Sequence, residues 1–101
     1  MIVEFHEAAQ DEFDAAVAHY SAISEDLGQG FRTEAERAIQ RIIEKPNAWK
    51  PIGPLRMYQF KRFPYGIVYR VHDGKVKVYA VMHLKRRPGY WRKRLQAPKQ
   101  G

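Results

Sequence analysis

The stretch IVYRVHDGKVKVYAVMHL, residues 67–84, decides the fold, because two alternating apolar runs flank the pair Asp73-Gly74. Both residues tolerate positive φ, so an Asp-Gly pair between such runs is a strong signal for a two-residue β-hairpin. We therefore predict antiparallel strands at 67–72 and 75–84, with His72 opposite Lys75.

This register divides the hairpin side chains between two faces. One face is apolar and has to pack against the rest of the chain: Ile67, Tyr69, Val71, Val76, Val78, Ala80 and Met82. The other face mixes cationic, aromatic and aliphatic groups: Val68, Arg70, His72, Lys75, Lys77, Tyr79, Val81 and His83. Ordinary solvated strand positions would explain the charged members, but they would leave Val68 and Val81 in water. We therefore expect the second face to bind a partner.

Upstream of the hairpin, the sequence predicts a short strand at 2–5 and then two helices. Apolar residues recur at spacings of three and four from Ala9 to Ile23 and again from Phe31 to Ile43, which is the spacing of one helix face. We expect the glycine-bearing link at 27–30 to separate the helices, and Pro46 to end the second one. The acids Asp11, Glu12 and Asp14 are expected to lie largely on the side of the first helix away from its apolar stripe.

The segment at 46–54 is rich in proline and glycine and is predicted to be a loop that Trp49 attaches to the core. A further strand is expected at 55–60 and a turn at 63–66. The predicted fold class is therefore α+β, with an N-terminal strand and an antiparallel helical hairpin packed on a twisted, mostly antiparallel four-stranded sheet. We expect one domain at 1–95 and a flexible tail at 96–101.

The charges of the chain are divided between its two halves. Residues 1–44 contain ten of the eleven acids and three arginines, which gives a net charge of −7. Residues 45–101 contain fifteen Lys and Arg and only Asp73 as an acid, which gives +14. A merely soluble surface needs mixed charges rather than segregated ones. The second half is therefore expected to attract a polyanion or an acidic protein.

The sequence KRRPGYWRKRL at 85–95 contains six of those fifteen Lys and Arg residues. The pair Tyr90-Trp91 is too apolar to stay in water. We expect it to dock on the core and to bring the neighbouring cations to one rim: Arg86, Arg87, Arg92, Lys93 and Arg94.

Several classes of chemistry have no support in the sequence. There is no cysteine, and the histidines lack metal-ligand spacing, so we expect neither a disulfide, a metal nor a cofactor. No phosphate-binding glycine loop or nucleophile elbow is present. The acidic start and the lack of a long apolar run indicate neither a signal peptide nor a membrane segment, and a cytoplasmic protein is expected.

Three sets of residues give the chain a resemblance to a known family. They are RFPYGIVYRV at 62–71, AVMH at 80–83, and the spacing of His83, Arg86, Pro88, Tyr90, Trp91 and Arg94. With these motifs, and with Ala8, Glu12, Tyr20 and GQGF at 28–31, the chain resembles the RelE/ParE superfamily of bacterial toxins over residues 2–94. The resemblance implies a RelE/ParE-like fold, a growth-arresting role in a type II toxin–antitoxin pair, and an acidic antitoxin as partner in a hetero-oligomer.

The resemblance leaves two mechanisms open. RelE-like members cut messenger RNA on the ribosome, with two lysines and an arginine on the strands and an arginine and a tyrosine near the C-terminus. Here the strand positions fall near Met57, Gln59 and Gly66, although a shifted turn would bring up Lys61 or Arg62. Only Arg86 or Arg87 and Tyr90 match plainly. ParE-like members bind and poison DNA gyrase without a catalytic residue. The absence of most nuclease residues from this chain favours the ParE-like mechanism.

The candidate residues follow from these two mechanisms. If the chain is a ribonuclease, the catalytic candidates are His83, Arg86 and Tyr90, since imidazole titrates near neutrality. For target or antitoxin binding the candidates are Arg62, Arg70, Lys77, Tyr79, Arg86, Arg87, Trp91 and Arg94. The alternative for His83 is local hydrogen bonding, and for Tyr90 and Trp91 it is packing. For Arg86 and Arg87 the alternative is a solvated basic tail. A non-toxic, basic nucleic-acid-binding module is a third possible function, based on charge alone.

Overall fold

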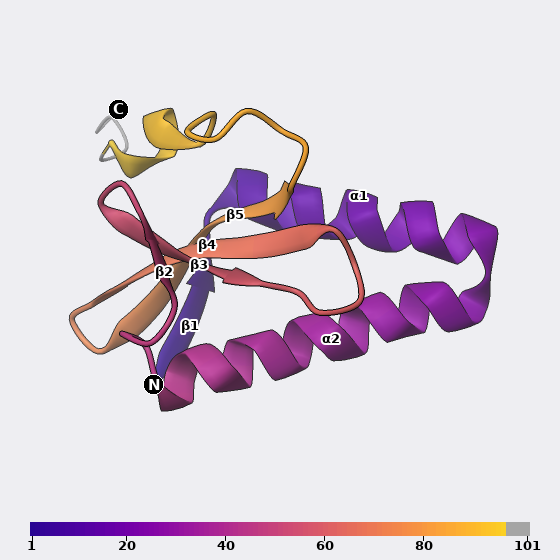
Figure 1. Cartoon of the computed structure of the whole chain (residues 1–101), viewed down its shortest axis with the longest axis horizontal. Helices are drawn as coiled ribbons and strands as arrows, with labels where there is room; N and C mark the ends of the chain where they lie inside the picture. Colours follow the sequence, from indigo (N-terminus) through magenta and orange to yellow (C-terminus); the bar gives the residue numbers. More distant parts are fainter. Residues whose placement is uncertain (97–101) are drawn as a thin grey trace.

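A five-stranded mixed sheet forms the centre of the computed structural model, which describes residues 1–96. The elements in chain order are β1 (Ile2–Phe5), α1 (Glu7–Ile23), α2 (Glu25–Glu44), β2 (Lys50–Ile52), β3 (Leu55–Gln59), β4 (Tyr65–His72), β5 (Lys75–His83) and a 3-10 turn η1 (Arg92–Leu95). The strand order is β1-β5-β4-β3-β2, and β1 pairs with β5 in parallel while the other pairs are antiparallel. Figure 1 shows the two helices running antiparallel and extending past the sheet.

The predicted fold class is confirmed, with one strand more than expected. The segment predicted as a loop at 46–54 contains β2, which pairs with β3 at the edge of the sheet. Pro51 lies in this strand and cannot donate a backbone hydrogen bond, which a strand tolerates only at an edge or a bulge. Trp49 attaches the segment as predicted, because its ring packs edge-on against Tyr58 with centroids 4.8 Å apart.

The helical hairpin turns at Ser24 rather than at the predicted glycine link. Ser24 is extended, with φ −163° and ψ 151°, and its hydroxyl accepts a hydrogen bond from the backbone N–H of Leu27 at 3.1 Å. A serine at this position caps the start of a helix. The predicted link at 27–30 therefore lies inside the first two turns of α2.

Gly28 has a packing role within α2. A Cβ atom at this position would lie 1.9 Å from Oγ of Ser21 and 3.0 Å from its Cα. The missing side chain allows α2 to approach the backbone of α1 closely, next to the turn.

The β4–β5 hairpin forms around Asp73-Gly74 as predicted, and both residues have positive φ. His72 pairs with Lys75 and Tyr69 with Val78. The register then shifts by one residue at a β-bulge, so that Val68 pairs with Ala80 and Ile67 with Val81. The turn before β4 was predicted at 63–66, but β4 begins at Tyr65, so the predicted turn ended two residues too late.

The bulge corrects the predicted sorting of side chains on β5. Ala80 and Met82 were expected to face the helices, but they lie in a cluster with Leu55, Val68 and Trp91. Val81 moves the opposite way and joins the cluster formed with the helices. An inserted residue reverses the alternation beyond it, and the apolar–polar pattern gave no sign of the insertion because both neighbours are apolar.

The sheet is therefore covered on both faces. The helices bury one face with Phe31, Ile42, Ile67, Tyr69 and other apolar side chains. Residues 84–95 cover the other face, which the sequence suggested would be open for a partner (Figure 1). The predicted flexible tail at 96–101 lies outside the described residues from residue 97 onward.

We expect Gly28→Ala to destabilise the fold by about 1–2 kcal/mol. Overpacking costs ~1–3 kcal/mol, and the better helix propensity of alanine returns up to about 1 kcal/mol. Urea denaturation followed by circular dichroism measures the change. The exchange variant Ser21→Gly/Gly28→Ala restores the space between the helices and should regain most of the loss. If the single and the double variant are equally unstable, the close approach is not the cause.

Candidate functional site

The C-terminal segment docks on the sheet through Trp91. Its side chain is fully buried in the cluster with Leu55, Val68 and Met82. Tyr90 and Leu95 are partly buried and pack against the same cluster. The predicted docking of the Tyr90-Trp91 pair is confirmed. Trp91 packs inside the molecule, so in this conformation it offers no surface to a partner.

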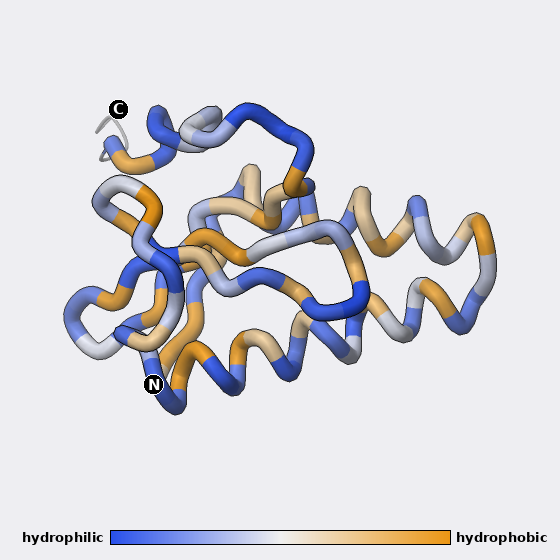
Figure 2. Tube along the Cα trace, in the orientation of Figure 1, coloured by the Kyte–Doolittle hydropathy of each residue, from blue (hydrophilic) through white to orange (hydrophobic). Residues whose placement is uncertain are grey.

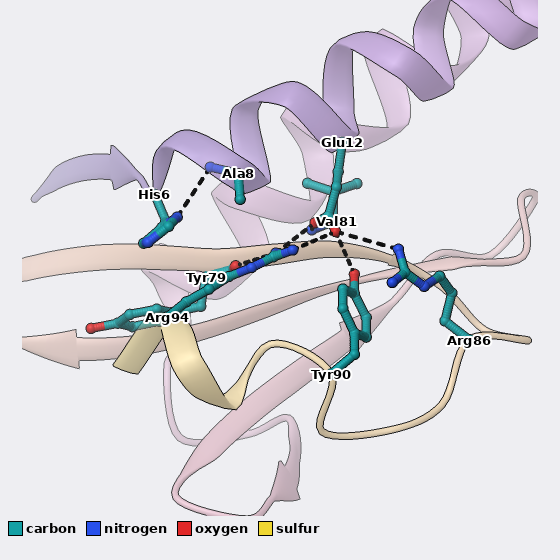
Figure 3. Close-up of polar contacts among 8 residues, drawn as sticks. All are labelled: His6, Ala8, Glu12, Tyr79, Val81, Arg86, Tyr90 and Arg94. Carbon is teal, nitrogen blue, oxygen red and sulfur yellow. Dashed lines mark hydrogen bonds and ion pairs between the residues drawn. The ribbon is translucent and has the colours of Figure 1, made fainter. Parts of the chain in front are cut away.

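Glu12 holds this segment in place. Its Oε1 accepts hydrogen bonds from Nη1 of Arg94 at 2.9 Å and from the backbone N–H of Val81 at 3.0 Å. Its Oε2 accepts from Nη2 of Arg94 at 2.9 Å and from the Tyr90 hydroxyl at 2.7 Å. Figure 3 shows these groups converging on the carboxylate from α1, β5 and the C-terminal segment. The sequence placed Glu12 on the outer side of α1, and the structure corrects this.

The ionisation of this cluster follows from its contacts. Burial by itself would raise the pKa of Glu12, but hydrogen bonds from Arg94, Tyr90 and the Val81 backbone outweigh it and lower the pKa. Burial and the hydrogen bond to Glu12 raise the pKa of Tyr90 well above its ordinary value. A tyrosine in this environment keeps its proton at neutral pH and transfers it poorly, so the hydroxyl acts as a structural donor.

Arg94 is also held from a second side. Nη1 donates to the backbone carbonyl of Tyr79 at 2.9 Å, and only 17% of the Arg94 side chain is exposed. Tyr79 itself is buried. The guanidinium of Arg70 lies 3.5 Å from its hydroxyl, and Nζ of Lys77 lies 5.8 Å from its ring centroid. The structure thus brings four of the predicted binding residues together around Tyr79: Arg70, Lys77, Tyr79 and Arg94.

Outside the contacts around Glu12 and Tyr79, the C-terminal segment presents a set of exposed cations. We call these residues the cationic rim: Lys85, Arg86, Arg87, Arg92 and Lys93. Figure 2 shows the corresponding hydrophilic stretch directly after β5. The only acid within ion-pair distance of the rim among residues 1–96 is Glu12, whose Oε2 lies 3.9 Å from Nη1 of Arg86. The guanidinium of Arg86 also stacks on the Tyr90 ring at 3.8 Å, which holds it while leaving about half of the side chain exposed.

His83 lines an open pocket of about 310 Å³ between α1 and β5, together with Glu12, His19, Tyr65 and Arg86. Its Nδ1 accepts a hydrogen bond from the backbone N–H of Lys85 at 3.1 Å, and its ring packs edge-on against Tyr65. The local hydrogen bond gives His83 a structural role in the turn after β5. The pocket does bring His83 and Arg86 together, as the nuclease hypothesis requires.

The strand positions that the nuclease mechanism needs carry no charge here. Met57 is buried in the cluster around Trp91, and Gly66 is buried against it, where an added Cβ would lie 2.8 Å from the Met57 sulfur. Gln59 is exposed and neutral. Arg62 and Lys61 lie on the turn between β3 and β4 beside α2, apart from the rim (Figure 1).

The described part of the chain offers neither a metal-binding cluster nor a membrane-spanning helix. Among residues 1–96 there is no group of three or more His, Cys, Asp or Glu side chains positioned to hold a metal ion. None of the helices formed by these residues is long and apolar enough to cross a membrane.

Comparison with known proteins places this architecture. Residues 3–88 match the model of a protein family described as the ParE toxin of the type II toxin–antitoxin system parDE. A solved chain from the chromosomal ParDE toxin–antitoxin system of P. aeruginosa is similar, with a TM-score of 0.71 over 84% of this chain and 97% of that chain. The two sequences are 15% identical, so this likeness concerns the fold alone. No curated protein sequence matches the chain.

We expect Glu12→Gln to destabilise the protein by about 2 kcal/mol near neutral pH, because it leaves the largely buried Arg94 without its counter-charge. The depressed pKa of Glu12 adds stability above the unfolded value of about 4.5, and this stability is lost as pH falls through the folded pKa. The gap between wild type and variant should therefore be constant above about pH 5 and narrow below pH 4.5.

Chemical denaturation at a series of pH values measures this gap. Asp11→Asn is the matched control, because Asp11 is exposed one position earlier in α1. It should change stability by less than about 0.5 kcal/mol. A loss of equal size in both variants would show that only the charge of α1 matters, and would exclude Glu12 as the residue that holds the segment.

Proposed function

The chain belongs to the ParE toxin family of type II toxin–antitoxin systems, and from this premise we propose that it arrests growth by binding DNA gyrase through the cationic rim. An acidic antitoxin that occupies the rim would keep the toxin inactive. The family match confirms the resemblance inferred from the sequence. The choice of gyrase as target and the role of the rim are our proposal.

One observation carries the proposal. In the segment that resembles the nuclease branch most closely, the candidate proton-transfer groups have structural contacts and the cations are exposed. The Tyr90 hydroxyl donates a hydrogen bond to Glu12, and Nδ1 of His83 accepts one from the Lys85 backbone. The rim remains exposed. Guanidinium groups suit carboxylates and phosphates on a binding partner.

The same rim supports an acidic antitoxin as partner. Exposed cations on a surface with little compensating acid attract an oppositely charged protein and speed its association. A partner that covers Arg86 and Arg87 would hide the groups that we assign to gyrase. Inhibition would then follow from competition for one surface, with no change of fold.

We predict that the purified protein blocks supercoiling of relaxed plasmid by gyrase, and that Arg86→Gln/Arg87→Gln needs about tenfold more protein for half-inhibition. The matched control is Arg32→Gln/Lys50→Gln, which removes the same charge from exposed residues on α2 and β2. The control should inhibit like wild type. If both double variants weaken equally, overall charge and not the rim determines inhibition.

The ribonuclease mechanism makes a different prediction in cells. Mapping of RNA ends after expression would show in-frame cuts in translated messages, and these cuts would disappear in Tyr90→Phe and His83→Gln. We expect no such cuts, and growth arrest that co-expression of a short acidic antitoxin relieves. In-frame cuts with active gyrase would overturn the proposal. Harmless expression would leave the third possibility, a non-toxic nucleic-acid-binding module.

A further inference from the structure

A second group of cations lies at a pocket on the helical side of the molecule, apart from the rim. The pocket has a volume of about 140 Å³ and is formed by the outer side of α2 and the turn between β3 and β4. Arg37 and Arg41 line it from α2, one helical turn apart, and Lys61 and Arg62 line it from the turn. The cations thus come from two elements that are distant in the sequence and converge on one hollow.

The one acid that lines this pocket does not neutralise them. Oε2 of Glu34 accepts hydrogen bonds from the backbone N–H groups of Lys61 and Arg62, the second at 3.0 Å. Within residues 1–96 none of the four cations lies within ion-pair distance of an acid. Glu34 therefore binds the turn through its backbone, and the four cations outnumber the single carboxylate that lines the pocket. Such a concentration of like charge repels itself, and a bound anion relieves the repulsion.

Gly30 leaves room for Arg62 at the pocket. A Cβ atom on Gly30 would lie 3.2 Å from Nη2 of Arg62, and the Arg62 guanidinium lies 5.4 Å from the Phe63 ring centroid. Glycine within a helix costs about 1 kcal/mol relative to alanine. Here the glycine leaves room for a guanidinium directly against the α2 backbone. The guanidinium of Arg62 therefore lies beside the α2 backbone at the pocket.

We propose that this pocket binds a backbone phosphate of DNA. A phosphate is tetrahedral and presents acceptor oxygens in several directions, which suits cations that approach from α2 on one side and from the turn on the other. A carboxylate is planar and pairs best with a single guanidinium fork. The pocket has room for one such anionic group, and Thr33 adds a hydroxyl at its edge. The site therefore contacts the phosphate backbone and reads no base sequence.

The role of this site rests on the proposed function, because a gyrase poison works on an enzyme that holds DNA. In Figure 1 the C-terminal segment that carries the rim lies on one side of the sheet, and α2, which lines the pocket, lies on the other. A toxin with both sites would contact gyrase through one and the bound DNA through the other. The pocket then adds affinity for the gyrase–DNA complex over gyrase alone.

The test is the binding of the whole protein to a dye-labelled duplex of about 20 base pairs, followed by anisotropy at several salt concentrations. We expect Arg37→Gln/Arg41→Gln to weaken binding about tenfold and to lower the salt slope by about 1–2. The control Arg32→Gln/Lys50→Gln has the same net charge and should keep the wild-type slope. Circular dichroism and thermal melting verify that both variants are folded, since glutamine keeps the helix propensity.

Two outcomes would overturn the inference. If the control loses as much affinity as the pocket variant, DNA binds to overall charge and not to this site. The second outcome concerns poly-glutamate with as many residues as the duplex has base pairs. If it displaces the duplex from wild type, and if Arg37→Gln/Arg41→Gln loses poly-glutamate binding but keeps DNA binding, the pocket binds an acidic protein instead.

Supercoiling assays on the same proteins separate this inference from the proposed function. A pocket variant that binds DNA like wild type and still inhibits gyrase would disprove the pocket alone. A wild-type protein that leaves gyrase active, but whose DNA binding depends on Arg37 and Arg41, would disprove the gyrase target alone.

Discussion

One carboxylate connects the parts of this molecule that matter for function. Glu12 joins α1 to residues that follow it by 69, 78 and 82 positions in the chain: Val81, Tyr90 and Arg94. Trp91 supplies the buried apolar contact that brings the C-terminal segment to the sheet, and Glu12 determines how the segment lies there. Without this ionic tie the segment would keep a hydrophobic anchor but lose its orientation. The cationic rim owes its fixed geometry to both contacts.

The division of charge along the sequence becomes a division of roles in the fold. Glu12 and Glu34 are two acids of the first half that act at long range, and each contacts a basic segment of the second half. Glu12 does so through the side chains of Arg94 and Tyr90, while Glu34 uses the backbone of the β3–β4 turn. The cationic rim and the four pocket cations stay exposed. The excess of positive charge is therefore displayed on ordered segments, which suits binding to a polyanion or an acidic protein.

The sequence predicted those features that depend on local pattern. The Asp73-Gly74 turn, the two amphipathic helices and the docking of the Tyr90-Trp91 pair all follow from spacing and hydropathy. The bulge at Tyr79 could not be predicted in this way, because Ala80, Val81 and Met82 are all apolar and fit either face. The helix break was misplaced because glycine is a stronger signal than a capping serine. Gly28 and Gly30 instead allow α2 to lie close to α1 and to the β3–β4 turn, respectively. Glu12 reads as a surface acid between Asp11 and Asp14, and a contact 82 residues away leaves no trace in a local pattern.

The central claim is that the C-terminal segment is docked as a fixed part of the fold, and the two tryptophans allow a direct test within one molecule. The Trp91 side chain is fully buried, whereas Trp49 is only partly buried near the end of α2. Hydrogen exchange of the two indole N–H protons, followed by NMR, compares them under identical conditions. The account predicts that the Trp91 indole proton exchanges far more slowly than that of Trp49. Rapid exchange of both protons would contradict it, because it would show that the segment and its rim are not held on the sheet.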